Sequence, residues 1–294
     1  MLEQVLGQLE PRPGQVVLDC TIGRAGHAAA VIDRIGPDGW LIGLDLDPAN
    51  VAFARQRLAD APCRVNIEHG GFDDAGVRLE MLGADSVDLL LADLGFASPQ
   101  MDDPQRGFSF AEDGPLDMRM DSTAGATAAD LVNALPADEL ANVIYQYGEE
   151  RLSRVIARKI VEQRRDSPIK TTRQLAELCA AAYGPRAGRQ RIHPATRTFM
   201  ALRIAVNDEL NRLERLLDQL PELIGPSGRA AIISFHSLED RQVKHAFRRY
   251  AAESGVRLLT KKPLRPEPDE RHANPRCRSA KLRAIAFEKT HGVA

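Results

Sequence analysis

Four short apolar runs alternate with amphipathic stretches over the first 93 residues, and this alternation constrains the fold more than any other feature. Each run is rich in Val, Ile or Leu and is short enough to be a strand rather than a helix. The predicted strands begin at Val16, Leu41, Arg64 and Val87. Strands that alternate with helices predict a doubly wound parallel sheet, and a fifth run at Ala230–Phe235 extends this sheet far along the chain.

The segment Val16–His27 combines the first strand, a glycine-containing turn and the start of a helix. Gly23 and Gly26 allow the backbone to turn sharply and to approach a ligand closely. A turn of this kind at the carboxyl end of a parallel sheet binds nucleotides in many α/β proteins. Because many similar turns bind nothing, the segment alone leaves ligand binding open.

Three of the predicted strands end in an acidic residue, namely Asp19, Asp45 and Asp93. The carboxyl ends of parallel strands meet at one edge of the sheet, so we expect these carboxylates to converge there. They would repel a phosphate-rich ligand such as NADP, whereas the cationic sulfonium of S-adenosylmethionine suits them. Asp45 follows Gly26 by 19 residues, where a carboxylate that binds ribose hydroxyls is expected, and this spacing suits NAD as well. The alternative role for Asp45, a helix N-cap, fits Asp47 better because Pro48 follows it.

The Gly- and Pro-rich segment from residue 93 to 121 is too long for an ordinary connection, so it is either functional or disordered. Its aromatic and methionine side chains favour an ordered active-site loop. From about residue 127 to 183 the pattern predicts helices without strands, which indicates an inserted all-helical domain. A single long helix is predicted from about residue 196 to 220, with the polar sequence N-D-E on its exposed side. The predicted domains are 1–121, 122–195 and 196–294, the last with a basic C-terminal tail.

The net charge of -2 conceals an uneven distribution of charge. From Arg257 onward there are ten basic and four acidic residues, a balance that suits contacts with RNA phosphates. Basic residues also line the predicted helix at 151–165, which is either a solvated face or a surface that contacts RNA. The four cysteines lie far apart without a C-x-x-C pair, so we expect no metal and no disulfide. No apolar run approaches the ~20 residues that span a bilayer, and no signal peptide is evident, so we expect a cytoplasmic protein without a membrane partner.

Long motifs across nearly the whole chain resemble the ribosomal RNA small subunit methyltransferase H family. They include D-x-T-x-G-R-x-G-H at 19–27 and A-D-L-G-x-x-S-P-Q-x-D-D at 92–103. Further matches in the same order are R-G-F-S-F, D-G-P-L-D-M-R-M-D, Y-G-E-E-R, H-P-A-T-R-T-F, N-D-E-L, S-F-H-S-L-E-D-R and N-P-R-x-R-S-A-K-L-R. The resemblance implies a class I methyltransferase fold with an inserted helical domain. It also implies methylation of the exocyclic N4 of a P-site cytidine in 16S rRNA.

By the same resemblance, the residues that contact S-adenosylmethionine are Ala25, Gly26, His27, Asp45, Phe72, Asp93 and Gln100. Phe72 is either a stacking partner for a planar base or a core residue. Ala25 stands where the family usually has Gly, but its backbone N–H is expected to remain available. Phe96 and Ala97 replace smaller or hydroxylated residues, and the family's H-x-P-V-L opening is absent before Leu2.

Asp93 is the first candidate for the catalytic group, either as acceptor for the target amino group or as a holder of the cofactor's methionine end. His236 follows the fifth strand and is the second candidate, although a lone His at this position is often structural. Ser237 and Asp240 are expected to cap the helix that begins there. The target base must leave its stack, and the candidates for stacking on it are Phe96, Phe108 and Phe110.

Two other functional classes share parts of this pattern. A nicotinamide-dependent oxidoreductase would share the glycine turn and Asp45, and a non-catalytic RNA-binding assembly factor would share the basic segment. The sequence leaves open whether the substrate is naked 16S rRNA or the assembled small ribosomal subunit. It also leaves open whether the chain forms a homodimer.

Overall fold

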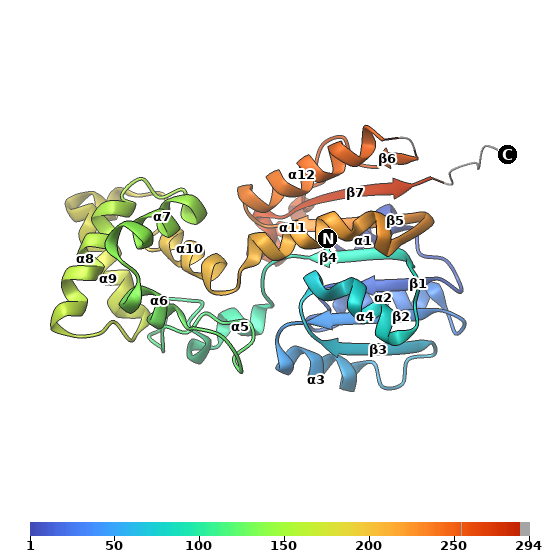
Figure 1. Ribbon diagram of the computed structural model, residues 1–294, viewed down its shortest axis with the longest axis horizontal. Coiled ribbons are helices and arrows are strands. Elements are labelled where there is room, and N and C mark those ends of the chain that lie inside the picture. Colours follow the sequence, from blue (N-terminus) through green and yellow to red (C-terminus); the bar gives the residue numbers. More distant parts are fainter. Residues whose placement is uncertain (254, 289–294) are drawn as a thin grey trace. The chain divides into compact units, whose positions relative to one another are not determined.

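The computed structural model describes residues 1–253 and 255–288, and it divides the chain into two compact units (Figure 1). One unit contains Met1–Gly95 and the chain from Leu210 onward, and the other contains Phe96–Glu209. The domain boundaries predicted near residues 121 and 195 stay a prediction. Among the described residues, no helix combines the length and the apolarity that a membrane crossing requires.

The first unit is built on a seven-stranded sheet with the strand order β3-β2-β1-β4-β5-β7-β6. Strands β1 to β5 run parallel, while β7 is antiparallel to both β5 and β6. Their bounds are β1 Val16–Asp19, β2 Trp40–Asp45, β3 Arg64–His69, β4 Val87–Asp93, β5 Ile224–Ser234, β6 Val256–Leu258 and β7 Lys281–Phe287. The four predicted N-terminal strands are confirmed, and so is the class I methyltransferase fold that the resemblance implied.

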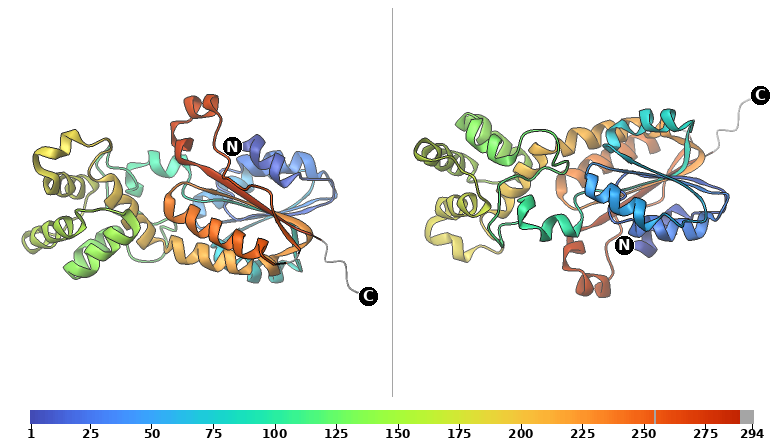
Figure 2. Two further views of the ribbon diagram at one scale, coloured as in Figure 1. Left: turned by 90° about the horizontal axis from the view of Figure 1, so that it is seen from above. Right: turned by 90° about the horizontal axis from the view of Figure 1, so that it is seen from below.

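Helices cover both faces of this sheet (Figures 1 and 2). One face packs against α4 Ala75–Leu82, α11 Glu209–Leu223 and α12 Ser237–Ala251. The other packs against α1 Leu2–Leu9, α2 Gly26–Ile35 and α3 Pro48–Arg57. Successive residues of a strand point to opposite faces, so Leu18 and Leu90 enter the first core while Val17, Leu89 and Leu91 enter the second. Each such buried side chain contributes about 1.5–3 kcal/mol of hydrophobic stabilisation.

The basic segment at the end of the chain contains two strands that the sequence did not predict. β7 lies between β5 and β6, and its apolar residues Leu282 and Ile285 are fully buried. This strand was not predicted because it contains the charged residues Lys281 and Arg283. Both bind Asp240 of α12, at 2.9 Å and 2.8 Å. Lys289, the last basic residue, lies outside the described residues.

The second unit is helical, and its backbone is described throughout. Its elements are α5 Ser98–Asp102, η2 Pro104–Arg106, α6 Ala128–Ala134, α7 Ala137–Gly148, α8 Ser153–Asp166, α9 Thr172–Tyr183, η3 Gly184–Arg189 and α10 Thr196–Val206. The loop predicted over 93–121 is partly helical, because α5 and η2 lie within it, and residues 107–121 form an ordered loop. Leu116 and Met118 are buried, and Asp117 binds the Arg119 guanidinium through both carboxylate oxygens at 2.8 Å.

The single long helix predicted from residue 196 to 220 is wrong, because α10 ends at Val206 and α11 begins at Glu209. Asp208 adopts a left-handed conformation with φ 51°, which ends the first helix. Asn207 is buried beside this break. Its side-chain oxygen accepts the Met120 N–H at 2.7 Å, and its amide donates to the Met118 and Arg203 carbonyls at 2.8 Å and 2.9 Å. Asn207, at the break between the two helices, therefore anchors the ordered loop.

Replacing Asn207 by Ala should lower the free energy of unfolding by about 2–3 kcal/mol, because the buried Met120 N–H loses its acceptor. Urea denaturation measures this change. The matched control is Gln105→Ala, which removes an exposed side-chain amide from the same unit. Equal stabilities of the two variants would contradict the role assigned to Asn207.

Candidate active site

Three carboxylates lie at the carboxyl edge of the first unit's sheet. Asp19 ends β1 and aligns with Gly43 of β2 and Leu91 of β4. Asp45 and Asp93 each follow their aligned residue by two positions, so the three acids occupy neighbouring strand ends. Burial raises the pKa of Asp19 to about 7, with smaller contributions from the charges of Asp93 and Asp45. The predicted convergence of the three acids is confirmed.

The turn after β1 is closed by backbone hydrogen bonds and by Asp45. The Gly23 N–H donates to Asp45 Oδ2 at 2.9 Å. Ala25 is fully buried and has a left-handed conformation with φ 55°. This backbone conformation costs a residue with a Cβ atom about 1–2 kcal/mol. The Ala25 N–H donates to the Ile22 carbonyl at 2.7 Å. The expectation that this N–H remains available for a ligand is therefore wrong.

Helix α2 starts immediately after this turn, at Gly26, and no side chain caps it. The first N–H groups of an uncapped helix have no acceptor within the helix. Gly26 and His27 thus present backbone donors beside the acidic edge, and the helix N-terminus carries a partial positive charge. A polar ligand with acceptor groups fits this end of the site.

Asp45 is held by three groups on its two carboxylate oxygens. Besides the Gly23 N–H, it accepts the Asp47 N–H at 2.8 Å and the Asn50 side-chain amide at 3.3 Å. Asp47 is the residue that caps α3, through the Ala49 N–H at 2.9 Å. The helix-cap alternative for Asp45 is therefore excluded. Burial raises its pKa in spite of these donors.

Asp93 has the least satisfied carboxylate of the three. Its backbone N–H donates to Thr21 Oγ1 at 2.7 Å, which fixes the end of β4 against the turn. Its side chain is 31% exposed, yet Oδ1 is buried and meets no hydrogen-bond partner among the residues that the structure describes. Burial raises the pKa of Asp93 to about 7. A buried acceptor without a donor is costly unless a ligand supplies one.

His27 lies beside Asp93, with Nδ1 at 3.7 Å from Oδ2. Burial lowers the pKa of His27 to about 4, so its ring is neutral at pH 7. The contact is therefore not an ion pair, and His27 does not neutralise the carboxylate. Thr21, which positions Asp93, was not selected from the sequence. Its position two residues after Asp19, in the D-x-T motif, is the sequence signal that could have indicated this role.

Phe72 lies in the short helix η1 Phe72–Asp74, directly after β3. Its ring is partly exposed and packs against the core face that contains α4 and α11. It is thus neither a fully buried core residue nor a free surface side chain. Because β3 is parallel to β2, Phe72 follows the carboxyl end of its strand, at the edge of the sheet that carries the acids.

Gln100 belongs to the second unit, where it is buried. Its side-chain oxygen accepts the Ala97 N–H at 2.7 Å and caps the short helix α5. Phe96 and Phe108 stack on each other with ring centroids 5.1 Å apart, and the Arg203 guanidinium lies 4.9 Å from the Phe96 centroid. These two rings already have partners within the unit.

Phe110, the third candidate for base stacking, also packs within the second unit. Its ring centroid lies 4.6 Å from that of His193 and 4.8 Å from that of Phe199. All three aromatic candidates therefore belong to ring clusters of their own unit. Their contact with a substrate base stays a prediction.

His236 is the N-cap of α12, and the predicted cap pair of Ser237 and Asp240 is wrong. The His236 Nδ1 atom accepts the Glu239 N–H at 3.4 Å. In return the Glu239 carboxylate accepts the Phe235 and His236 N–H groups at 2.8 Å and 3.2 Å. This capping box gives His236 a structural use, and its catalytic role stays a prediction.

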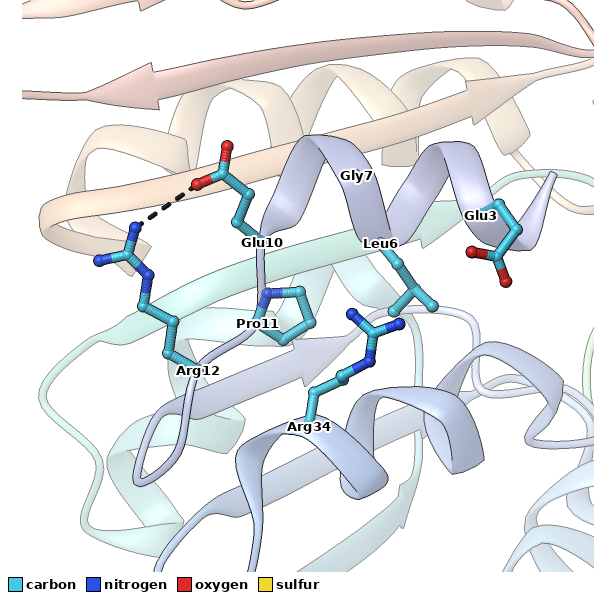
Figure 3. A pocket seen from close by; sticks show the side chains of 7 residues that line it. All are labelled: Glu3, Leu6, Gly7, Glu10, Pro11, Arg12 and Arg34. Carbon is cyan, nitrogen blue, oxygen red and sulfur yellow. Dashed lines mark hydrogen bonds and ion pairs between the residues drawn. The ribbon is translucent and has the colours of Figure 1, made fainter.

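A separate cavity of about 350 Å³ lies at the opposite edge of the first unit's sheet, between α1 and the end of α2 (Figure 3). Glu10 and Arg12 on its rim are 3.4 Å apart, and Arg34 approaches from α2. These charges are exposed, and the lining includes no residue of the glycine turn. The acidic edge, with its uncapped helix and unsatisfied carboxylate, is the stronger candidate.

Replacing Asp19 by Asn should stabilise the protein at high pH. The folded-state pKa is raised from 3.8 to about 7, so the wild type loses stability as the pH rises through that range. The advantage of the amide variant should be small near about pH 4 and reach at most about 4 kcal/mol above about pH 7, at about 1.4 kcal/mol per pKa unit. Chemical denaturation across this range measures it, with the exposed Asp33→Asn as control. A pH-independent difference would contradict the assignment.

Comparison with known proteins identifies the family of this chain. The MraW methylase family matches residues 1–288. "Ribosomal RNA small subunit methyltransferase H" of Geobacter sulfurreducens is 50% identical and covers 97% of this chain and 96% of its own. The protein of the same name from Pelobacter propionicus is 48% identical with the same coverage. A solved structure of Aeropyrum pernix fibrillarin with natively bound S-adenosyl-L-methionine matches at TM-score 0.43 and 11% identity, covering 97% of this chain and 74% of that one. The chain belongs to the MraW methylase family of S-adenosylmethionine-dependent methyltransferases.

Proposed function

We propose that this protein methylates the exocyclic N4 of a decoding-centre cytidine in the 16S rRNA of the small ribosomal subunit. The observation that carries the proposal is the 48–50% identity, over nearly the full length of both chains, to relatives named as ribosomal RNA small subunit methyltransferases. The choice of N4 rests on the family resemblance of the motifs. Family membership disfavours the nicotinamide-dependent alternative.

The acidic edge suits S-adenosylmethionine as the methyl donor. It offers carboxylates to ribose hydroxyls and to a cationic ligand, and Asp93 Oδ1 is a buried acceptor that lacks a donor within the described chain. We assign the cofactor contacts to Ala25, Gly26, His27, Asp45, Phe72, Asp93 and Gln100. Since the Ala25 N–H is already used, we expect Ala25 to contribute shape rather than a hydrogen bond. When bound, the cofactor supplies an electrophilic methyl group on a positively charged sulfur.

Asp93 is the residue to which we assign the handling of the target amino group. The N4 lone pair is delocalised into the cytosine ring, so an acceptor that polarises the N–H bonds makes this nitrogen a better nucleophile. The ionised Asp93 carboxylate accepts a hydrogen bond from N4 and takes up the proton that the methylated nitrogen loses. The Thr21 hydroxyl holds the Asp93 backbone in place, and such positioning lowers the barrier.

The substrate is an RNA, and two basic surfaces support this proposal. Between β6 and β7, an excursion with helix α13 Pro268–Ala273 and η4 Pro275–Ser279 stands out from the sheet (Figure 2). Its exposed basic residues are Lys261, Lys262, Arg265, Arg271, Arg276 and Arg278. On the second unit, α8 exposes Arg154, Arg158 and Arg165. Exposed cations of this density suit a phosphodiester backbone.

Not every basic residue of the C-terminal segment is available for RNA. Lys281 and Arg283 are bound to Asp240, and Arg257 Nε lies 3.1 Å from Glu288. We therefore assign phosphate contacts to the excursion rather than to the strands that flank it. This distinction is not visible in the composition of the segment.

Deletion of the gene should remove a methyl group from the N4 of one decoding-centre cytidine in 16S rRNA. Mass spectrometry of nuclease fragments from deletion and complemented cells measures this loss. Purified protein with labelled S-adenosylmethionine should restore the mark on 16S rRNA or on small subunits from the deletion strain. An unchanged pattern at the decoding centre would contradict the proposal, and RNA binding without methyl transfer would favour an assembly factor.

The turnover rate should rise between about pH 6 and about pH 8 as Asp93 ionises, because its pKa is raised to about 7. Asp93→Asn should lower kcat by about 10²–10⁴-fold and remove this rise. Single-turnover methylation across the pH range measures both effects, with the exposed Asp85→Asn as control. If Asp93 holds the methionine end instead, the variant should chiefly weaken binding of S-adenosylhomocysteine in calorimetry, and the assignment of proton transfer would fail.

A further inference from the structure

The loop that carries Phe72 is attached to α11 by a set of polar contacts that the methyl-transfer chemistry does not explain. We infer that Arg212, Arg215 and Gln219 of α11 are positioning residues for the cofactor, because they hold the Phe72 loop through Asp73. We call Asp73, Arg212, Arg215 and Gln219 the Asp73 clamp. The inference deepens the proposed function, since it rests on the assignment of Phe72 to the cofactor site.

The centre of the clamp is the carboxylate of Asp73, which is only 9% exposed. Arg212 Nη1 donates to Oδ1 at 2.8 Å. Arg215 donates to Oδ2 through Nη2 at 2.8 Å and through Nε at 3.2 Å. One carboxylate that is largely buried thus receives three charge-assisted hydrogen bonds from two guanidinium groups, of which that of Arg212 is the less exposed.

Gln219 fastens the backbone at Asp73 and at Gly76. Its Nε2 donates to the Asp73 carbonyl at 2.8 Å, and its Oε1 accepts the Gly76 N–H at 3.3 Å. Residues 212, 215 and 219 are spaced by three and four, so their side chains lie on one face of α11. The clamp therefore fixes both the side chain and the backbone of the residue that follows Phe72.

Helix α11 is a rigid support for these contacts. Its neighbouring stripe, Leu213, Leu216, Leu217 and Leu220, is buried in the same core cluster against which Phe72 packs. The loop is also tied to the cofactor edge of the sheet, because the Gly70 N–H donates to the Asp45 carbonyl at 3.0 Å. Phe72 is thus held between Asp45 on one side and α11 on the other.

Gly71 leaves the space in which the clamp closes. A Cβ atom on this residue would collide with Arg212 Nη1 and with Asp73 Oδ1. Gly71 has an ordinary negative φ of -82°, so the restriction comes from space and not from backbone conformation. The glycine directly before Phe72 is therefore explained by the passage of the Arg212 side chain.

The clamp predicts a defect in cofactor binding rather than in chemistry. Asp73→Asn keeps the shape of the side chain but removes the charge, and it should raise the Kd for S-adenosylhomocysteine by about tenfold. Arg212→Ala and Gly71→Ala should act in the same direction. Because Arg212 makes a single hydrogen bond to Oδ1, Arg212→Lys should restore the wild-type Kd to within about threefold. At saturating cofactor, kcat should stay within about twofold of wild type.

Isothermal titration calorimetry with S-adenosylhomocysteine on the full-length chain measures the Kd, and thermal melting reports stability. The matched control is Asp218→Asn, which removes the partner of Arg249 from the exposed side of the same helix. An unchanged Kd in Asp73→Asn, or an equal loss of affinity in Asp218→Asn, would overturn the inference. A different outcome would overturn only the proposed substrate. In that outcome the wild type binds S-adenosylhomocysteine, the clamp variants raise the Kd as expected, and the wild type does not methylate 16S rRNA.

Discussion

Carboxylates are costly to bury, and the parallel arrangement of β2, β1 and β4 brings three of them to one edge of the sheet. Each strand ends in Asp, so the fold itself creates the acidic edge. The protein relieves part of the cost with local donors. Gly23, Asp47 and Asn50 donate to Asp45, and the Thr21 N–H donates to Asp19. Burial still raises the pKa of all three carboxyl groups, and Asp93 Oδ1 has no hydrogen-bond donor among the described residues.

Much of the first unit could be predicted because its signals are local. Short β-branched runs place the parallel strands, and the rule that their carboxyl ends meet places the three acids. The second unit's helices follow from the spacing of apolar residues. Asp47, rather than Asp45, caps α3, as the neighbouring Pro48 indicated. In each case a residue and its immediate neighbours contain the information.

The remaining features depend on partners that are distant in the chain. β7 contains Lys281 and Arg283, whose charges hide a buried strand until Asp240 of α12 is seen beside them. Asn207 looked like a polar residue on a helix surface, yet it serves the loop at Met118 and Met120. No periodicity reports such pairings, since they arise only when separate segments meet.

The placement of β5 has a consequence for how the chain folds during synthesis. Strands β1 to β4 lie within the first 95 residues, but β5, which pairs with β4, follows only after the whole second unit. The edge of β4 therefore stays open while residues 96–209 are made, and an open strand edge can pair with another chain. A compact second unit shortens the effective loop that must close before β5 can pair. The inserted unit thus influences how long an aggregation-prone half-sheet persists, independently of any role in recognising RNA.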